Sequence, residues 1–455
     1  MPESDPPADL SAIVKAYDIR GVVPDQLNEK LAHEFGAAFA ALVDASTVVI
    51  GHDMRESGGP LSRAFAVGVT EQGADVVEVG LSSTDMLYFA SGYLDTPAAM
   101  FTASHNPAKY NGIKLCRAGA APVGQDTGLG QLREWVENDS LPRNGGKTGS
   151  VTNRNLLPEY AEFLHKLVDL SSIRPLTVVV DAGNGMGGYT VPAVFAKVPV
   201  TVVPMYFELD GSFPNHEANP IEPANTRDLQ AKVREVGADV GLAFDGDADR
   251  CFVIDERGEI VSPSVLTALI AVRELERDPG SSIIYNLITS KAVPEIVREH
   301  GGVPVRSRVG HSFIKGTMAE TGAVFGGEHS GHFYFRNFWR ADSGMLAALH
   351  VLAALGGQDR PLSELLAEYS RYIASGEINS TVDDQAGRLV AIKQAYADRP
   401  GVTIDELDGV TVDGGDWWFN VRPSNTEPLL RLNVEAANDR DMARVRDEAL
   451  AIIRG

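Results

Sequence analysis

The sequence predicts an α/β protein built from three doubly wound segments and a smaller C-terminal α+β segment. Short β-branched runs alternate with alanine-rich stretches over residues 15–371, and such alternation is typical of parallel sheets covered by helices. The strands that follow lie close together and end in one amphipathic stretch. The length of 455 residues also favours several cores, because chains above roughly 250–300 residues usually split into domains.

The segment boundaries follow shifts in this pattern. We expect α/β segments over residues 1–150, 151–255 and 256–371, and the α+β segment over 372–455, with the Gly-containing stretch 142–150 as the first linker. The expected strands of the α/β segments are Thr47–Gly51, Ala74–Val79, Ala98–Ala103, Thr177–Asp181, Val198–Val203, Val240–Phe244, Cys251–Asp255, Ser282–Asn286, Val303–Val309 and Ala323–Phe325.

The C-terminal segment differs because only short turns separate its strands. The expected strands are Val410–Val412, Trp417–Val421 and Leu429–Val434, and short turns favour antiparallel pairing since parallel strands need a long crossover. Over Asn438–Arg454 apolar residues recur at helical spacing, at Met442, Val445, Ala449 and Ile452. We therefore expect a small antiparallel sheet followed by a helix.

Composition excludes several classes of partner. Lys plus Arg number 40 and Asp plus Glu number 62, which gives a net charge of −22. Nucleic acid and anionic membranes need a basic surface, so we expect neither as a partner. No apolar run reaches the roughly 18–20 residues of a membrane span, and two cysteines fit reduced thiols in a cytoplasmic protein. The expected partner is a small molecule, which a local cationic pocket would bind if it is an anion. The composition does not distinguish a monomer from a dimer.

The stretch Phe101–Pro107, with sequence FTASHNP, places Ser104 on a turn directly after a strand, and Pro107 fixes the exit of that turn. An exposed serine at such a place can act as a nucleophile or carry a phosphate. The alternatives are a turn serine and a hydrolase serine; the second lacks the usual G-x-S-x-G elbow. His105 is the adjacent residue, so it need not face Ser104 as a base would.

The stretch Asp245–Arg250, with sequence DGDADR, places three carboxylates on one turn after an apolar strand. Three anions this close are costly without a cation, and hard oxygen ligands select Mg²⁺, Mn²⁺ or Ca²⁺. The spacing to Glu256 imitates an EF-hand loop, but Arg250 stands where that loop needs glycine. A divalent site is therefore preferred over an EF-hand or a solvated acidic turn.

Two later loops carry further polar side chains. In Gly326–His332, Glu328, Ser330 and His332 alternate, so one face of an extended loop offers an acid, a hydroxyl and an imidazole to a polyol. A metal-ligand loop or a capped helix start is the alternative there. In Arg422–Pro428, a guanidinium, two hydroxyls and an amide form an anion nest, with a plain hairpin turn as the alternative.

A glycine-rich turn suggests a second function class. Gly183, Gly185 and Gly188 follow a strand in the G-x-G-x-x-G pattern of dinucleotide sites, and Asp210 lies at about the expected distance. Asp181 at the mouth of the turn is unfavourable beside a pyrophosphate. A packing turn of an ordinary α/β domain is the preferred interpretation over a nicotinamide-dependent oxidoreductase.

Together these motifs resemble those of the α-D-phosphohexomutase superfamily, in the order of that family and from Tyr17 to Thr426. They are T-A-S-H-N-P with N-G-I-K, D-G-D-A-D-R, G-E-H-S-G-H and R-P-S-N-T-E-P. The resemblance implies three similar α/β domains and a C-terminal domain of TATA-box-binding-protein-like topology, arranged around a central cleft. It also implies an isomerase that moves a phosphoryl group between two hydroxyls of a hexose phosphate.

The resemblance also assigns roles to residues. Ser104 is the expected phosphoserine, and Mg²⁺ is expected on one of its phosphoryl oxygens and on Asp245, Asp247 and Asp249. Hexose 1,6-bisphosphate is the expected intermediate and activator. Glu328, Ser330 and His332 correspond to the sugar-recognition loop, and Arg422, Ser424, Asn425 and Thr426 to the site of the non-transferred phosphate. Lys114 or His332 is the expected general base. Shorter local motifs match further substrate-binding, cationic or acid–base positions: Tyr17, Arg20, Lys114, Arg250, Lys291 and His311.

Sugar preference is read from two positions of the loops. Phosphoglucosamine mutases usually carry Gly where Asn425 stands and Gln where His329 stands, whereas many phosphomannomutases carry Met at the second position. The motifs most resemble bacterial phosphomannomutase/phosphoglucomutase members, so we expect a phosphomannomutase that extends to glucose phosphates. The alternatives are a phosphoglucosamine mutase and a non-catalytic sugar-phosphate-binding protein, which would need Arg422 but not Ser104.

Overall fold

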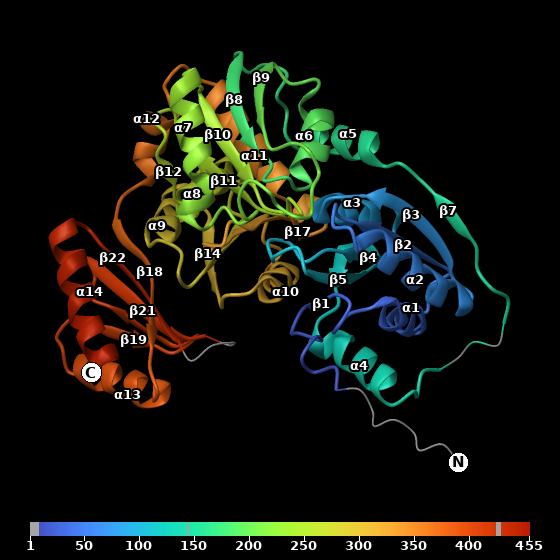
Figure 1. The fold of residues 1–455 in the computed structure, drawn as a ribbon. Helices are drawn as coiled ribbons and strands as arrows, with labels where there is room; N and C mark the ends of the chain where they lie inside the picture. Colours follow the sequence, from blue (N-terminus) through green and yellow to red (C-terminus); the bar gives the residue numbers. More distant parts are fainter. Residues whose placement is uncertain (1–8, 143, 145, 425–428) are drawn as a thin grey trace. The chain divides into compact units, whose positions relative to one another are not determined.

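The computed structural model describes residues 9–142, 144, 146–424 and 429–455, which form two compact units (Figure 1). The first unit contains the described residues up to Val261 and also Ser330–Ser363. The second contains Ser262–His329 and the described residues from Glu364 onward. The chain passes from the second unit to the first inside the loop Gly326–His332.

The first unit opens with a seven-stranded sheet. Its elements are β1 (Ile19–Val22), α1 (Glu29–Val43), β2 (Thr47–His52), α2 (Gly58–Glu71), β3 (Asp75–Leu81), α3 (Thr84–Leu94), β4 (Ala98–Phe101), β5 (Tyr110–Arg117), β6 (Ala121–Pro122), α4 (Leu129–Glu137) and β7 (Val151–Asn153). The strand order is β1-β5-β4-β2-β3-β7, with β6 on β5. Strand β2 runs parallel to β3 and β4, but β5 runs antiparallel to β4. The connection 102–109 is too short for a crossover, so the sheet is mixed rather than purely parallel.

Helices cover both faces of this sheet. Helices α1, α2 and α4 bury Phe35, Phe65 and Leu132 in one core with Ile50 and Phe101 of the strands. Helix α3 contacts β2, β4 and β5 and begins at Ser83, whose Oγ accepts from the backbone N–H of Met86 at 3.2 Å. Helices α1 and α2 approach closely through glycine. A Cβ atom at Gly68 would lie 2.0 Å from the carbonyl oxygen of His33.

The rest of the first unit is built around a five-stranded sheet of order β12-β11-β10-β8-β9. The elements are α5 (Leu157–Leu167), β8 (Leu176–Asp181), α6 (Gly187–Phe195), β9 (Val200–Met205), α7 (Arg227–Val236), β10 (Val240–Phe244), β11 (Cys251–Ile254), β12 (Ile260–Val261), β16 (Phe333–Phe335), β17 (Ala341–Asp342) and α11 (Gly344–Gly356). Strands β8, β9 and β10 are parallel, and β11 is antiparallel to β10. The short connection 245–250 forces this second reversal. Helix α7 packs Leu229 and Val233 on the sheet, and α11 contacts β11.

The second unit begins with a three-stranded parallel arrangement. Its elements are α8 (Pro263–Arg277), β13 (Ser282–Asn286), α9 (Ala292–Glu299), β14 (Val303–Ser307), α10 (His311–Thr321) and β15 (Phe325–Gly327), and the short helix α12 (Leu362–Leu366) follows later in the chain. Strand β13 lies between β14 and β15 and is parallel to both. Helix α9 contacts β14, and α8 contacts β15. The predicted strand Ser282–Asn286 is confirmed, and the one predicted at Val303–Val309 ends earlier, at Ser307. The third strand begins at Phe325, where the prediction of Ala323–Phe325 had ended it.

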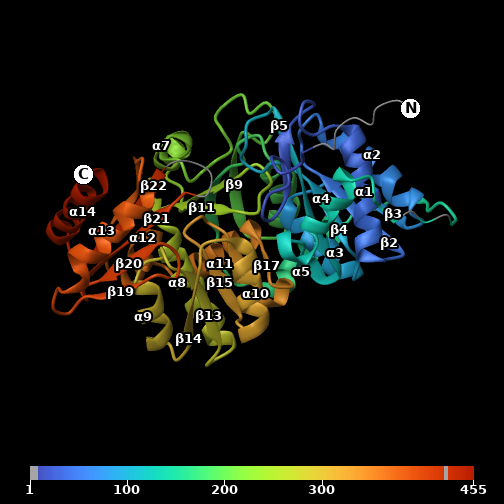
Figure 2. The same cartoon turned by 90° about the horizontal axis from the view of Figure 1, so that it is seen from below.

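The chain ends in an antiparallel sheet of order β18-β22-β21-β20-β19. The elements are β18 (Ile373–Thr381), α13 (Gln385–Ala397), β19 (Thr403–Asp405), β20 (Val410–Asp413), β21 (Trp417–Pro423), β22 (Leu429–Ala436) and α14 (Asp439–Arg454). Alternate strand residues such as Phe419 and Val421 form a core with Tyr396 of α13 and Val445 of α14, so both helices cover one face (Figure 2). Strand β18 carries no clear apolar pattern and was not predicted, because it is largely exposed and bulges between Ala374 and Glu377.

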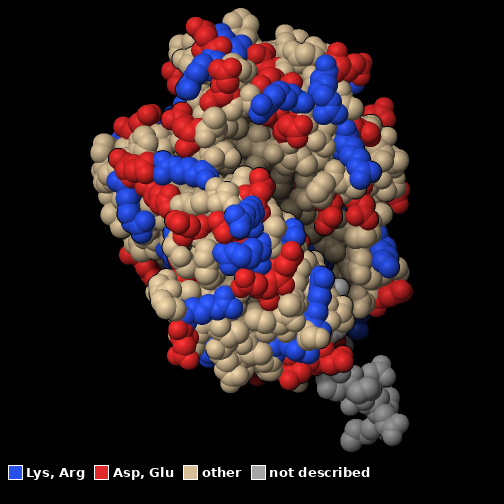
Figure 3. Space-filling view, turned by 90° about the vertical axis from the view of Figure 1, so that its left-hand side faces the viewer, with Lys and Arg blue, Asp and Glu red and all other residues tan. Residues whose placement is uncertain are grey.

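The predicted fold class is confirmed: three α/β segments precede an antiparallel α+β segment. The correction concerns strand direction, since each of the two sheets of the first unit contains at least one antiparallel neighbour. Within the described residues no helix combines the length and the apolar character that a membrane crossing needs. Acidic and basic side chains are interspersed on the face drawn in Figure 3, in a chain whose net charge is −22.

Candidate active site

Ser104 lies on the connection 102–109 between β4 and β5. Ser104 is only 5% exposed. Its backbone adopts a left-handed conformation with a φ of 50°, which costs free energy for a residue with a Cβ atom. The hydroxyl donates to Asp245 Oδ2 at 2.8 Å. The loop therefore presents Ser104 Oγ directly to the acidic loop that follows β10.

His105 lies closer to the serine than adjacency alone predicts, since its Nδ1 is 3.2 Å from Ser104 Oγ. That nitrogen also accepts from Arg250 Nη2 at 2.7 Å. Burial, together with the charges of Arg250 and Arg20, lowers the pKa of His105 to about 3. A neutral imidazole already occupied by a guanidinium proton is a poor base for Ser104.

The three predicted carboxylates converge on the connection 245–250 between β10 and β11. Asp245, Asp247 and Asp249 are at most 1% exposed, and one oxygen of each lies within 4.8 Å of the others. The Oδ1 atoms of Asp247 and Asp249 are buried and accept no hydrogen bond from any described residue. Such atoms are costly to bury unless a cation binds them. The donor set is all oxygen and therefore fits a hard divalent metal ion.

Cationic side chains surround this triad. Lys114 of β5 donates from Nζ to Asp247 Oδ2 and Asp249 Oδ2, both at 2.7 Å. Burial alone would lower the pKa of Lys114, but the two carboxylates outweigh burial and hold the pKa well above its ordinary value. Arg250 donates from Nε to Asp245 Oδ2 at 3.0 Å. Burial raises the pKa of Asp245 despite this partner.

The N-terminal candidates lie beside the serine loop. Arg20 of β1 donates from Nη1 to Asn106 Oδ1 at 2.6 Å and pairs through Nη2 with Asp18. Its Nε is buried and has no hydrogen-bond partner among the described residues. Tyr17 is partly buried in the bend before β1. The structure thus brings Arg20, Lys114, Arg250 and the acidic triad to one loop cluster around Ser104.

The second half of the loop Gly326–His332 belongs to the same unit. His332 Nδ1 lies 2.9 Å from Ser330 Oγ, and His332 Nε2 lies 3.6 Å from Asp249 Oδ1. Asp342 of β17 joins His332 and Asp249 in a second group with ligand atoms within 4.8 Å of one another. The imidazole therefore lies beside the metal-binding triad, just beyond hydrogen-bonding distance of Asp249.

The first half of that loop belongs to the second unit. Glu328 is 2% exposed and accepts from the backbone N–H of Gly310 at 3.1 Å, so it anchors the start of α10. Burial lowers the pKa of the neighbouring His329 imidazole, and the Arg422 charge adds to that effect while Glu377 opposes it. His311 is the first residue of α10, and its side chain lies outside the described residues.

The predicted anion nest contains more charge than its motif shows. Arg422 of β21 donates to Glu377 Oε2 at 3.0 Å, and Arg431, its cross-strand partner on β22, donates to Glu377 Oε1 at 3.1 Å. Arg431 Nη2 also lies 3.5 Å from Ser424 Oγ. The buried Nε atoms of both arginines have no hydrogen-bond partner among the described residues. Asn425 and Thr426, named above with this nest, lie outside the described residues.

Lys291 lies elsewhere in the second unit. Its Nζ donates to Asp413 Oδ1 at 2.9 Å and to the carbonyl oxygen of Gly415 at 2.7 Å. It lines a cavity of about 300 Å³ whose lining does not include Glu328 or Arg422. The ammonium group of Lys291 is thus paired with Asp413.

The glycine-rich turn after β8 serves packing. A Cβ atom at Gly185 would lie 2.7 Å from the carbonyl oxygen of Gly246, so this glycine lets the turn touch the acidic loop. Asp181 accepts from the Gly183 N–H at 2.8 Å, and His216 Nε2 lies 3.0 Å from its other oxygen. The turn therefore closes on protein groups, in agreement with the preferred interpretation.

Comparison with known proteins identifies the family of all four segments. Models of the phosphoglucomutase/phosphomannomutase alpha/beta/alpha domains I, II and III match residues 11–140, 158–258 and 262–372, and the model of the C-terminal domain matches residues 377–452. The chain belongs to the phosphoglucomutase/phosphomannomutase family. It is therefore a phosphohexomutase, an isomerase of a metal-dependent family.

Individual relatives agree over almost the full length. The chain is 41% identical to a protein named "Phosphohexose mutases" from Xanthomonas campestris pv. campestris, over 97% of this chain and 99% of the relative. It is 38% identical to the phosphomannomutase of Escherichia coli strain K12, over 96% and 97%. A solved phosphoglucomutase/phosphomannomutase family protein from Burkholderia thailandensis superposes with a TM-score of 0.88 at 33% identity, covering 97% of each chain.

Sequence analysis missed three polar residues of these clusters. Thr84, at the start of α3, donates its hydroxyl to Asp247 Oδ2 at 2.6 Å; its place in a helix-capping sequence, Ser83–Thr84, hid this contact. Glu377 and Arg431 join Arg422 only through strand pairing. No local signal links residues so far apart along the chain, and only the registers of β18, β21 and β22 bring them together.

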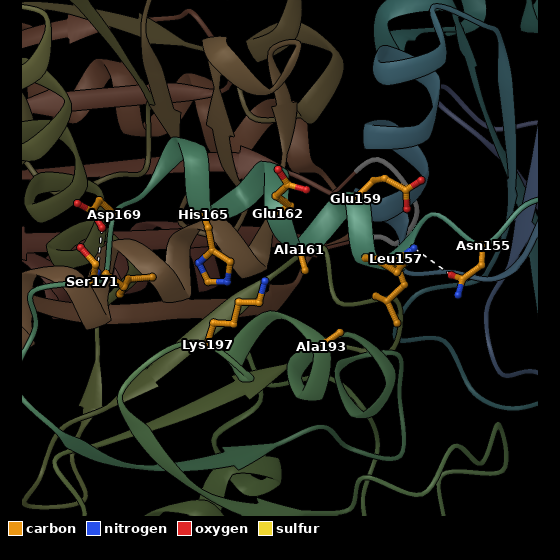
Figure 4. Close-up of a pocket in the computed structure, with 12 residues that line it drawn as sticks. Asn155, Leu157, Glu159, Ala161, Glu162, His165, Asp169, Ser171, Ala193 and Lys197 are labelled. Atoms are coloured by element: carbon orange, nitrogen blue, oxygen red, sulfur yellow. Dashed lines mark hydrogen bonds between the residues drawn. The ribbon is translucent and has the colours of Figure 1, made fainter.

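A separate groove of about 610 Å³ lies between α5 and the end of α6. His165 and Lys197 project into it, and acidic residues such as Glu162 border it (Figure 4). His165 Nε2 lies 2.8 Å from the carbonyl oxygen of Val194, so this imidazole ties α5 to α6. The lining contains none of the predicted site residues.

Proposed function

We propose that this phosphohexomutase interconverts mannose 6-phosphate and mannose 1-phosphate and also accepts the corresponding glucose phosphates. The observation that carries the proposal is the 2.8 Å hydrogen bond from Ser104 Oγ to Asp245 Oδ2, because it places a phosphorylatable oxygen on a metal-binding triad. The name of the Escherichia coli relative supports mannose phosphate as the substrate. We also propose four domains, at residues 1–150, 151–255, 256–371 and 372–455, and the four matched domain models support this division.

The proposed reaction transfers a phosphoryl group twice. Phosphorylated Ser104 donates its phosphoryl group to a free hydroxyl of the hexose phosphate, whose proton passes to a general base, and hexose 1,6-bisphosphate forms. After the bisphosphate turns over, its other phosphoryl group returns to Ser104 Oγ and the product leaves. Positioning and charge stabilisation dominate such a transfer, since the protein forms few covalent bonds itself.

Asp245, Asp247, Asp249 and a phosphoryl oxygen of Ser104 are the proposed ligands of one Mg²⁺ ion. Bound there, the ion would polarise the phosphoryl oxygens as a Lewis acid. Arg250 and Arg20 border the serine loop on its other sides, and we assign both to stabilisation of phosphoryl charge. His311 remains a proposed acid–base residue on the resemblance alone.

His332 is the proposed general base. The alternative, Lys114, holds its ammonium group against two carboxylates at 2.7 Å, which favours a charge-stabilising role. His332 offers an imidazole beside the triad and is oriented through Nδ1 by Ser330 Oγ at 2.9 Å. Such an oriented imidazole suits the transfer of a proton from a sugar hydroxyl.

The second unit supplies the proposed recognition groups. Arg422 and Ser424, with Asn425 and Thr426, would bind the phosphate that is not transferred, and the planar guanidinium of Arg422 suits a phosphate. Glu328 and Ser330 would contact sugar hydroxyls, with Tyr17 at the entrance. Lys291 fits this set least, because Asp413 already neutralises it. Two buried free thiols, Cys116 and Cys251, support a reducing, cytoplasmic setting.

A coupled assay with mannose, glucose and glucosamine phosphates tests the proposal on the wild type and on Ser104→Ala. We expect the highest kcat/KM with mannose phosphate and a loss of at least about a thousandfold in Ser104→Ala, because the phosphoryl carrier is gone. The exposed Ser171→Ala variant is the matched control and should keep wild-type activity. Equal activity of Ser104→Ala would contradict the mechanism, and a preference for glucosamine phosphate would contradict the substrate assignment.

A further inference from the structure

The buried guanidinium of Arg55 lies beneath the serine loop. Arg55 follows β2, is 3% exposed, and donates from Nη2 to the carbonyl oxygens of Ser104 and Asn106 at 2.8 and 2.6 Å. Its Nη1 donates to the carbonyl oxygens of Pro107 and Tyr110 at 3.0 and 2.9 Å. One planar group thus binds four carbonyls spread along the connection between β4 and β5.

The orientation of Arg55 is itself fixed. Its Nε donates to Asp53 Oδ2 at 3.2 Å, and its backbone N–H donates to Asp53 Oδ1 at 3.0 Å. All five N–H groups of the guanidinium are therefore used. The ring of Phe213 covers the guanidinium, with its centroid 5.2 Å from Cζ, and a Cβ atom at Gly211 would lie 2.8 Å from the Arg55 Cα atom. These contacts hold the guanidinium in one orientation beneath the loop.

The loop needs such a support. Ser104 is held at a positive φ of 50°, a conformation that persists only where surrounding contacts enforce it. Inside the loop, the Ser104 N–H donates to Thr102 Oγ1 and the Asn106 N–H donates to the Ala103 carbonyl oxygen. Those contacts bind the loop amides, whereas its carbonyls converge on Arg55. The Pro107 carbonyl oxygen also accepts from the Tyr110 N–H at 3.0 Å. Without Arg55, however, the carbonyls of Ser104, Asn106 and Tyr110 would each lose a buried donor, which is costly.

We propose that Arg55 is a positioning residue for phosphoryl transfer: by binding the carbonyls of Ser104, Asn106, Pro107 and Tyr110, it holds Ser104 Oγ at the metal-binding triad. The inference rests on the proposed function for its kinetic consequence, but not for the loop geometry itself. Arg55 reaches the carbonyl and not the hydroxyl of Ser104, so it acts through the loop. Lysine cannot replace it, because an ammonium group has three donors and no planar fork.

The test compares Arg55→Lys and Arg55→Ala with a matched control. Asp255 and Arg257 repeat the Asp53–Arg55 spacing and contacts, with Arg257 N and Nε donating to Asp255 at 3.0 and 3.4 Å, but the Arg257 side chain is 65% exposed. Arg257→Lys should keep wild-type kcat and KM. In Arg55→Lys we expect kcat to fall about 100-fold with KM within about threefold, because a shift of about 1 Å in the reacting atom costs that much.

Two readouts separate positioning from simple loss of stability. Amide hydrogen exchange of residues 103–110 should accelerate in Arg55→Lys and stay unchanged in Arg257→Lys, while the core strand β2 stays protected in both. Millimolar guanidinium should restore at least about tenfold of the lost kcat in Arg55→Ala by filling the vacated space, and urea at the same concentration should not. If the arginine variants fail to fold, Asp53→Asn, which keeps the guanidinium but weakens its orientation, is measured in the same way and should show the same changes in smaller measure.

Each contrary result overturns the inference. Wild-type loop exchange in Arg55→Lys, with or without a lower kcat, would show that the guanidinium does not hold the loop. A kcat within twofold of the wild type would show that the loop needs no such support. Hydrogen exchange requires no substrate, so a wild type inactive on all three hexose phosphates would defeat the proposed function and leave the test of Arg55 intact.

Discussion

At the candidate site, Asp247 and Asp249 each bind the Lys114 ammonium group through one carboxylate oxygen, while the other oxygen has no hydrogen-bond partner among the described residues. Asp247 shows this division most clearly. Its Oδ2 accepts from Lys114 and Thr84, and its Oδ1 accepts nothing from the described residues. A bound divalent ion would complete this arrangement, which is why the metal and the lysine can coexist at one carboxylate.

Replacing Asp247 by asparagine should weaken metal binding more than it weakens the fold. The amide still accepts from Thr84 but offers no charge to a cation. We expect the Mg²⁺ concentration for half-maximal activity to rise by more than about tenfold, since even changes in outer-shell contacts cost that much. Titration of activity with Mg²⁺ after chelator treatment measures it. Asp239→Asn, which alters a partly exposed pair with Arg174, is the control, and an unchanged Mg²⁺ requirement in Asp247→Asn would refute the assignment.

Arg422 should matter for binding rather than for chemistry. In the proposed role it contacts only the phosphate that is not transferred, so substrate and transition state gain equally from it. Losing one charge-assisted hydrogen bond costs about 1.5–3 kcal/mol, which corresponds to a KM about 10- to 150-fold higher in Arg422→Lys with kcat nearly unchanged. Steady-state kinetics measure both constants, with Arg444→Lys on the exposed face of α14 as the control. A fall in kcat at constant KM would place Arg422 in the chemical step instead.

At the scale of elements, one buried carboxylate joins three parts of the first unit. Asp85 of α3 accepts from Ser83 Oγ at 2.5 Å, from Tyr160 Oη of α5 at 2.7 Å and from Ser343 Oγ, just before α11, at 2.7 Å. These hydroxyls do not fully offset the loss of water, and burial raises the pKa of Asp85 to about 6 from an ordinary value of 3.8. Helices α3, α5 and α11 are thus joined through Asp85, and the folded state is more stable when this carboxyl group is protonated.

This raised pKa predicts a pH dependence of stability. Between about pH 4 and pH 6 the folded state keeps a proton on Asp85 that the unfolded chain has already released, so the free energy of unfolding falls as pH rises through this window. A shift of about two pH units corresponds to a loss on the order of 2–3 kcal/mol. Asp85→Asn cannot ionise, so its stability relative to the wild type should rise between pH 4 and pH 7. Denaturant unfolding at both pH values measures the difference, and a pH-independent difference would contradict it.

For the molecule as a whole, the first sheet and the C-terminal sheet bury separate hydrophobic cores. Phe419 is fully buried in the core of the C-terminal sheet, and Phe101 is fully buried in the first core. We therefore expect calorimetric unfolding in more than one transition, since separate cores need not unfold together.

Truncation of Phe419 should affect only one of these transitions. Phe419→Ala removes a buried ring at a cost of about 3–5 kcal/mol, and the transition of the second unit should move to lower temperature while the other stays in place. Phe101→Ala should do the reverse. A single transition that both variants lower equally would show that the two units unfold as one.

Local patterns predicted most of the strands and the loops that carry the candidate site residues. β-Branched runs gave most of the strands, because a strand buried on both faces carries its own apolar signature. The loop 245–250 predicted a cation site, because three carboxylates on one short loop stay close together in space. Ser104 on its turn was predicted for the same reason: a turn after a strand is a local event.

Only the tertiary structure decided which distant residues share a site. The antiparallel return of β5 and of β11 brings Ser104, Lys114 and Asp245 together, and strand register places Glu377 between Arg422 and Arg431. The tertiary structure also places Arg55 beneath the serine loop, about fifty positions away in sequence, and pairs Lys291 with Asp413. Hydrogen bonds and ion pairs depend on distances of a few ångströms in space and not on distance along the sequence. No local sequence pattern could therefore reveal these partners.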